Sequence, residues 1–144
     1  MREDPLVEIP VPERSTANPS ILIIDDVKEI VEELTTMLNL LDMPATGAYS
    51  LTGALAILER EPSIRVVSCD IRLSSESGSD LIDLVAERPA LAARDLAFLF
   101  MTGDAMRFDA TSTITGHPVL MKPVQPAELV RALRKLLRKG SPQE

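Results

Sequence analysis

Five short apolar runs, each followed by a longer segment rich in spaced apolar residues, organise this sequence. The runs are nearly continuous in apolar residues, which is typical of strands that are buried on both faces in a parallel sheet. Such strands alternating with amphipathic helices predict an α/β fold, a five-stranded parallel sheet that is doubly wound with helices on both faces. The predicted strands span residues 21–25, 45–49, 64–69, 96–101 and 118–121.

Most segments between and after these runs place apolar residues three and four positions apart, as one face of a helix requires. Asp26 and Ser50 are placed to cap the first two helices, and Pro126 suits the first turn of the last one. The predicted helices lie within residues 27–41, 51–58, 81–85 and 126–137, with a further short helix at 105–114, where the pattern is ambiguous.

The two ends of the chain are predicted to lie outside the folded domain. Residues 1–19 carry four prolines, at positions 5, 10, 12 and 19, so they cannot sustain a helix or a central strand. We therefore predict a flexible N-terminal tail at 1–19, one domain at 20–139 and a C-terminal tail at 140–144. The length of 144 residues suits a single domain.

Charge and cysteine content exclude several kinds of function. The formal charge is −7, from 22 acidic and 15 basic residues, which opposes direct binding to nucleic acid or to an anionic membrane. Cys69 is the only cysteine, so we expect neither an intrachain disulfide nor a thiolate metal cluster, and we interpret Cys69 as a small buried hydrophobe. No apolar signal core or membrane span is apparent, and we expect a soluble cytoplasmic protein.

Polar residues stand directly at the ends of four of the predicted strands. Asp25 and Asp26 end the first strand, and Asp70 follows the third. Thr102 ends the fourth strand and Lys122 ends the fifth. Because the carboxyl ends of parallel strands lie side by side, these five side chains are expected to converge on one shallow pocket.

Three carboxylates in one pocket require compensation, because like charges at close range raise at least one pKa strongly. A divalent cation would remove this conflict, and oxygen ligands with some waters retained suit Mg²⁺, or Mn²⁺ in its place. Asp26 and Asp70 are predicted as direct ligands, and Asp25 as a ligand that acts directly or through water. The backbone carbonyl of Arg72 could complete the ligands from the protein.

The same groups suit phosphoryl transfer. A carboxylate can act as a nucleophile and form an aspartyl phosphate, whose oxygens then need their charge neutralised. The cation and Lys122 could share that task, and Thr102 offers a hydroxyl donor at the right strand end. Catalysis in such a site consists mostly of positioning and charge compensation.

Four segments together resemble the receiver domains of response regulators in two-component signalling: ILIIDD at 21–26, VVSCDIRLSSESGSDLI at 66–82, FMTGDA at 100–105 and LMKP at 120–123. The resemblance covers about residues 20–139. Each segment alone is a weak signal, but the residues occur in order and each on its own strand end. The resemblance implies a flavodoxin-like sheet with the strand order 2-1-3-4-5.

The resemblance also implies a role for each residue at the strand ends. Asp70 would be the phospho-acceptor, and Asp25 and Asp26 the acidic pair that binds the metal. Thr102 would be the switch hydroxyl, and Lys122, expected before a cis peptide bond to the next residue, would pair with the phosphate.

The partners are likewise implied by the resemblance. A sensor histidine kinase or a histidine phosphotransfer protein would supply the phosphoryl group. Residues 105–139 would form the output surface, for a downstream protein target or a self-dimer. The chain would be a stand-alone receiver, or the receiver domain of a larger protein, and a signalling switch rather than an enzyme.

The sequence departs from the usual pattern of the family at two positions. Val119 stands where an aromatic residue is usual, three residues before the lysine, and Ser74 stands where a proline is usual. Arg72 and Asp104 flank the predicted pocket, and we hypothesise that they pair across it and limit the access of water to the phosphoryl group.

Two other functions compete with the signalling switch. One is a Mg²⁺-dependent phosphatase of the haloacid dehalogenase type, which needs a second Asp two residues after its nucleophilic Asp. Here Asp25 and Asp26 are followed at that spacing by Val27 and Lys28, which argues against the enzyme. The other is a receiver-like binding module that is never phosphorylated.

Overall fold

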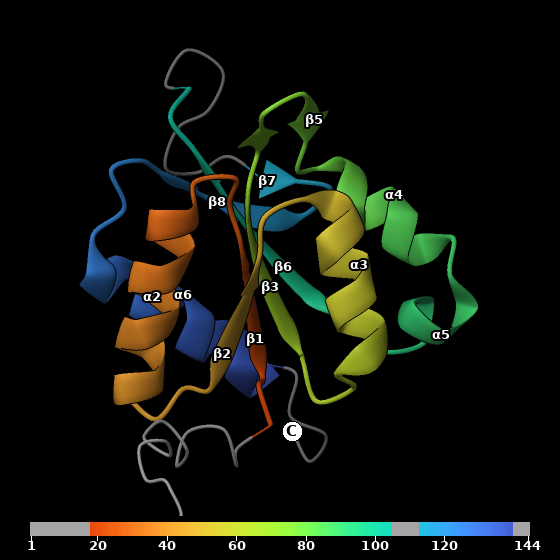
Figure 1. Cartoon of the computed structure of the whole chain (residues 1–144), viewed down its shortest axis with the longest axis horizontal. Helices are drawn as coiled ribbons and strands as arrows, with labels where there is room; N and C mark the ends of the chain where they lie inside the picture. The colour runs from red at the N-terminus through yellow and green to blue at the C-terminus, as the bar shows by residue number, and fades with distance from the viewer. Residues whose placement is uncertain (1–17, 105–112, 140–144) are drawn as a thin grey trace, which may run out of the picture.

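A parallel sheet forms the centre of the molecule in the computed structural model, which describes residues 18–104 and 113–139 (Figure 1). The parallel strands lie in the order β2-β1-β3-β6-β8, which is the predicted order 2-1-3-4-5. The α/β class and the doubly wound arrangement are therefore confirmed. The strands are β1 (Ile21–Ile24), β2 (Ala45–Ala48), β3 (Val66–Asp70), β6 (Ala97–Thr102) and β8 (His117–Met121).

Helices cover both faces of this sheet. Figure 1 shows α2 and α6 on one face and α3, α4 and α5 on the other. The described part of the chain contains no helix long and apolar enough to cross a membrane. The bounds of the helices are α2 (Lys28–Leu40), α3 (Leu51–Arg60), α4 (Asp80–Ala86), α5 (Pro89–Ala92) and α6 (Pro126–Lys139).

The continuous apolar runs supply two hydrophobic cores, one on each face of the sheet. In β1, Leu22 and Ile24 pack toward α3, while Ile21 and Ile23 pack toward α2 and α6. All four are completely buried. Successive side chains of a strand point to opposite faces, so a strand buried on both sides must be apolar throughout.

Three short strands were not predicted. β4 (Arg72–Leu73) and β5 (Glu76–Ser77) form a separate antiparallel hairpin directly after β3. β7 (Thr113–Ile114) pairs antiparallel with β8 at the edge of the main sheet. Two positive φ values, 51° at Thr115 and 84° at Gly116, turn the chain tightly between them.

The helix predicted at 105–114 is therefore wrong at its last two residues, which belong to β7. The turn at Thr115 and Gly116 returns the chain onto β8 and favours strand pairing there over a helical turn. Residues 105–112 lie outside the described part of the chain, as do residues 1–17 and 140–144, so the helix and the tails predicted there stay predictions.

The predicted helix starts differ in outcome. Ser50 caps α3 as expected, with its Oγ accepting a hydrogen bond from the backbone N–H of Gly53 at 3.1 Å. Pro126 is the first residue of α6. The cap predicted for Asp26 is wrong, because Val27 is the N-cap of α2 and no side chain caps it. The carboxylate of Asp25 instead accepts a hydrogen bond from the Val27 N–H at 2.9 Å.

Candidate phosphoryl-acceptor and metal site

The strand ends bring the five predicted residues to one edge of the sheet. Backbone hydrogen bonds fix the neighbouring strand ends there: the Lys122 N–H donates to the Thr102 carbonyl at 2.7 Å, and the Ile71 N–H donates to the Met101 carbonyl at 2.9 Å. Above this edge lies a surface hollow of about 730 Å³. Asp26, Asp70, Thr102 and Lys122 all line it, and Asp25 lies close by, completely buried.

Lys122 joins the two buried carboxylates of this edge. Its Nζ donates to Asp70 Oδ2 at 2.9 Å and to Asp25 Oδ2 at 3.4 Å. Asp25 has no solvent exposure and Asp70 is 7 % exposed, so water solvates neither carboxylate well. An ammonium at this distance is therefore their main compensation within the described part of the chain.

The pKa values of Asp25 and Lys122 reflect this burial. Burial raises the pKa of Asp25, and the hydrogen bond from Val27 and the charge of Lys122 only partly oppose that rise. Burial also lowers the pKa of Lys122, but the hydrogen bonds and negative charges of Asp70 and Asp25 outweigh it and leave the pKa raised. Lys122 is thus held in its charged form.

Asp26 occupies the rim of the hollow and is exposed. Its Oδ2 accepts a hydrogen bond from Ser74 Oγ at 2.7 Å. That bond is the main cause of a lowered pKa for Asp26, so its carboxylate is ionised at neutral pH.

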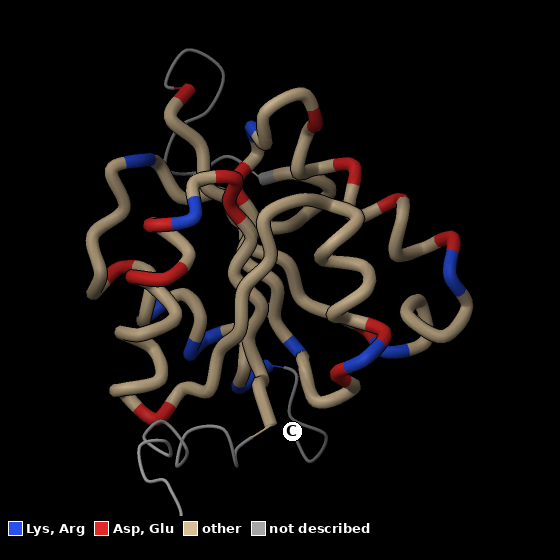
Figure 2. The backbone as a smooth tube through the Cα atoms, in the orientation of Figure 1, with Lys and Arg blue, Asp and Glu red and all other residues tan. Residues whose placement is uncertain are grey.

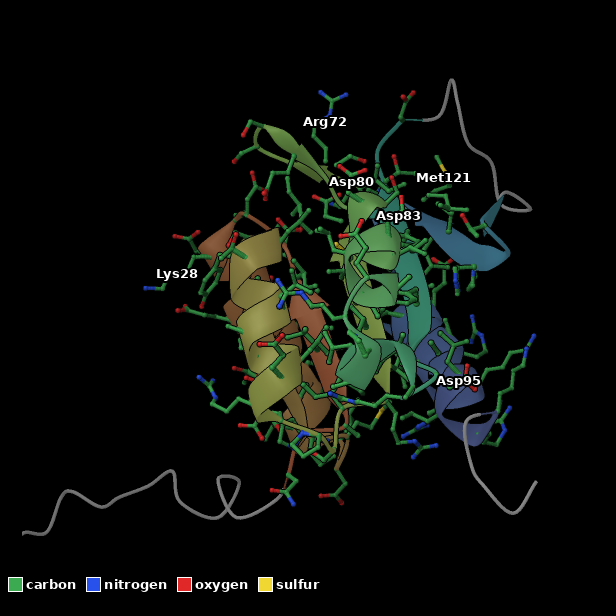
Figure 3. The ribbon with its side chains drawn as sticks, turned by 90° about the vertical axis from the view of Figure 1, so that its right-hand side faces the viewer. Lys28, Arg72, Asp80, Asp83, Asp95 and Met121 are labelled. Carbon is green, nitrogen blue, oxygen red and sulfur yellow. The ribbon has the colours of Figure 1, made fainter. Side chains whose placement is uncertain are left out.

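The three carboxylates could hold a metal ion together. Asp25, Asp26 and Asp70 each offer an oxygen, and these oxygens lie within 4.8 Å of one another. Figure 2 shows acidic backbone positions, in red, close together at the upper ends of the central strands. Hard oxygen donors open to solvent on one side fit Mg²⁺, which keeps several of its waters. Arg72 lines the same hollow, and its side chain extends away from the sheet into solvent (Figure 3). Its carbonyl as a ligand stays a prediction.

Thr102 places its hydroxyl at the wall of the hollow. The residue is 4 % exposed, and its Oγ1 accepts a hydrogen bond from the backbone N–H of Asp104 at 3.0 Å. Gly103, between them, has open space where a side chain would start. Asp104 and Arg72 line the same hollow, and their pairing stays a hypothesis.

Two features of the site were missed at the level of sequence. Ser74 contacts the proposed metal ligand Asp26, and the only hint was that the residue departs from the usual proline. Gly78 packs so closely that a Cβ there would lie 2.1 Å from the carbonyl oxygen of Asp70. A glycine after a polar loop signals a turn but does not reveal such a contact.

The structure also describes a predicted cis peptide bond and two further predicted residues near the site. The cis peptide bond between Lys122 and Pro123 is present. Cys69 is completely buried, and burial together with the charges of Asp70 and Asp25 raises its pKa, as expected of a structural thiol. Val119, at the position where an aromatic is usual, is 3 % exposed and pairs in register with Phe100 of β6.

Comparison with known proteins agrees with this geometry. The family model of the response regulator receiver domain matches residues 21–134. The two-component response regulator PprB of Pseudomonas aeruginosa is 30% identical over 119 residues, which are 81% of this chain and 43% of that protein. The chain therefore spans less than half the length of this relative.

Solved receiver domains have the same fold. A response regulator receiver domain protein from Clostridium thermocellum superposes with a TM-score of 0.71 at 24% identity, over 84% of this chain and 95% of the other. A response regulator receiver protein from Pseudomonas putida superposes with a TM-score of 0.67 at 26% identity, over 83% and 98%.

The chain belongs to the response regulator receiver domain family. Receiver domains are signalling domains of two-component systems rather than enzymes in the ordinary sense, and phosphorylation is their general switch. They typically bind Mg²⁺, and they interact with histidine kinases or phosphotransfer proteins.

Proposed function

We propose that this chain is a Mg²⁺-dependent phosphorylation switch that accepts a phosphoryl group on Asp70 from a histidine kinase or a histidine phosphotransfer protein. One observation carries the proposal: Lys122 Nζ lies 2.9 Å from Asp70 Oδ2 beside an open hollow, where Asp25, Asp26 and Asp70 offer oxygens that lie within 4.8 Å of one another. A nucleophilic carboxylate, a fixed cation and oxygen donors for a metal then stand at one place, as transfer to an aspartate requires.

The transfer requires only a few groups of this site. A carboxylate oxygen of Asp70 attacks the phosphorus, and the bond from phosphorus to the donor nitrogen breaks with its electron pair on the imidazole. Lys122 and the hydroxyl of Thr102 stabilise the charge on the phosphoryl oxygens. A bound Mg²⁺, held by Asp25, Asp26 and Asp70 and by the Arg72 carbonyl, would supply the remaining charge compensation.

Phosphorylation then changes the balance between two conformations. A phosphoryl group adds negative charge beside Asp25, which is buried and already compensated mainly by Lys122. We expect Thr102 to turn its hydroxyl toward the new charge and to lose the hydrogen bond that it accepts from the Asp104 N–H. The output surface is proposed at residues 105–139, of which α6 and the β7–β8 hairpin are described. We place this switch in the cytoplasm.

Intact mass spectrometry after incubation with Mg²⁺ and acetyl phosphate tests the proposal. Wild type should gain one phosphoryl group, and a chelator or the Asp70→Asn substitution should abolish the gain. Asp83→Asn is a matched control, because Asp83 is an acidic residue of α4 that does not line the hollow. A phosphoryl group that persists in Asp70→Asn, or none in wild type, would refute the proposal. Multiple turnover of a small phosphate ester would favour the phosphatase instead.

A further inference from the structure

The hairpin β4–β5 stands over the rim of the hollow and is pinned at several points. Leu73 is 1 % exposed and belongs to the core on the α3 side of the sheet. Opposite it, Glu76 Oε1 accepts a hydrogen bond from the backbone N–H of Leu51, the first residue of α3, at 3.3 Å. At the base, the Gly78 N–H donates to the Ile71 carbonyl at 2.6 Å. The hairpin is therefore held by packing and by hydrogen bonds on both strands.

Ser74 is the first residue of the two-residue turn between β4 and β5. Its φ of 52° lies in the left-handed region, which non-glycine residues rarely adopt and which this turn imposes. In this conformation Ser74 Oγ donates to Asp26 Oδ2 at 2.7 Å. The turn thus places the Ser74 hydroxyl against the Asp26 carboxylate of the metal site, 48 positions away in the sequence.

Asp26 needs such a partner more than the other two carboxylates do. Asp25 and Asp70 are buried and bonded to Lys122, whereas Asp26 is exposed, and its carboxylate is free of any ion pair among the described residues. An exposed side chain samples several rotamers, and fixing it has an entropic cost when a ligand binds. A partner that fixes the carboxylate beforehand removes part of that cost.

We propose that Ser74 is a positioning residue of the metal site, whose hydroxyl, carried by the β4–β5 hairpin, holds one oxygen of Asp26 and aims the carboxylate at the ion. The inference rests on the proposed function, because it concerns the same site. The proline that is usual at this position could not take this role, since it could neither offer a hydroxyl nor adopt a positive φ.

Titration of the full chain with Mg²⁺ by calorimetry tests the role directly. Ser74→Ala should raise the Kd for Mg²⁺ by about tenfold, the lower end of the effect of removing a partner of a metal ligand. Ser74→Gly, which relieves the positive φ and also lacks the hydroxyl, should raise the Kd equally. Ser75→Ala, the matched control in the same turn, should bind Mg²⁺ like wild type.

Phosphorylation kinetics separate positioning from a general loss of structure. If Ser74 acts on ion binding alone, the rate of phosphorylation by acetyl phosphate at saturating Mg²⁺ should stay at the wild-type value in Ser74→Ala, while the Mg²⁺ concentration for half-maximal rate rises. A fall in the saturating rate with an unchanged half-maximal concentration would overturn the inference.

The outcomes also distinguish this inference from the proposed function. If wild type binds Mg²⁺ and loses it in Asp70→Asn, but Ser74→Ala binds as tightly as wild type or more tightly, only the role of Ser74 is refuted. If Ser74→Ala binds weakly and Ser74→Gly normally, backbone strain rather than the hydroxyl is responsible, and the inference is refuted. If wild type binds no Mg²⁺, both fall together.

Discussion

Asp25 and Asp26 are neighbours in the sequence, yet they belong to two differently built regions of the site. Asp25 is completely buried and, with Asp70 and Lys122, forms what we call the inner half. Asp26 is exposed and, with Ser74 and Arg72, forms the rim. The inner half is positioned by strand ends and ion pairs, and the rim by a loop and one side-chain hydrogen bond.

The comparison shows that the two regions contribute different properties to one site. In the inner half, burial strengthens every electrostatic contact but makes the charged groups costly to maintain. At the rim, water solvates the charges, so each contact contributes less and the geometry depends on the hairpin. We therefore expect the chemistry to depend on the inner half and the tuning of ion binding to depend on the rim.

The largest effect should come from removing the cation of the inner half. Lys122→Met keeps an apolar stem of similar length but loses the ammonium that lies 2.9 Å from Asp70. Phosphorylation by acetyl phosphate at saturating Mg²⁺ should slow by roughly 100-fold, the scale for losing one group that stabilises transition-state charge. Initial rates from intact mass measure this.

Two other substitutions of basic residues serve as controls for Lys122→Met. Lys135→Met removes an exposed lysine of α6 away from the hollow and should leave the rate unchanged. Arg72→Ala removes a rim cation and should change the rate much less than Lys122→Met does. If Arg72→Ala proved as damaging as Lys122→Met, the division into inner half and rim would be wrong.

The next largest effect is expected at Gly78, which follows the β4–β5 hairpin of the rim and packs against Asp70 of the inner half. A Cβ at this position would lie 2.1 Å from the Asp70 carbonyl oxygen and 2.8 Å from Cys69 Sγ. Neither the backbone nor a buried neighbour can move without disturbing β3, so Gly78→Ala should lower the free energy of unfolding by about 2–3 kcal/mol. Urea unfolding followed by circular dichroism measures it.

Gly103→Ala is the matched control, because nothing lies within 4 Å of the Cβ it would add. We expect it to change the free energy of unfolding by no more than about 0.5 kcal/mol. Equal effects of the two substitutions would mean that the hairpin does not pack against the inner half as closely as the structure indicates.

The inner half could be predicted from the sequence, and the reason is topological. Asp25, Asp70 and Lys122 each follow an apolar run, and a parallel sheet necessarily brings the carboxyl ends of such runs together. No distance between them had to be known in advance. The continuous apolar runs also predicted the two-sided core, whereas the strand order was implied by the resemblance to receiver domains.

At the rim, the same topological argument predicted Asp26 but not its partner Ser74. β4 and β5 have two residues each, too few for any periodic pattern, so the hairpin that carries Ser74 left no signal in the sequence. The expected cap at Asp26 failed because α2 begins one residue later than its spacing suggested, and the Asp25 carboxylate took the Val27 N–H instead. Loop geometry of this kind follows from tertiary contacts rather than from local preference.

The smallest expected effect is on thermal stability in the presence of a chelator. Asp25 and Asp26 should contribute to that stability with opposite signs. Burial raises the pKa of Asp25 above its ordinary value of 3.8, so the folded state keeps this proton longer than the unfolded state does. Ionisation of Asp25 therefore lowers stability as the pH rises through its folded pKa. Asp25→Asn should raise Tm near neutral pH by a few degrees, equivalent to about 1 kcal/mol.

Asp26 should behave in the opposite way. The Ser74 hydrogen bond lowers its pKa below 3.8, so ionised Asp26 adds stability that is present above this value and is lost as the pH falls through the folded pKa. Asp26→Asn should lower Tm slightly near neutral pH, where Asp25→Asn raises it. The difference for Asp25→Asn should shrink as the pH falls toward 3.8, whereas the difference for Asp26→Asn should persist there and shrink only as the pH falls further, through the folded pKa of Asp26. Tm changes of the same sign for the two variants would show that burial does not separate these neighbouring carboxylates.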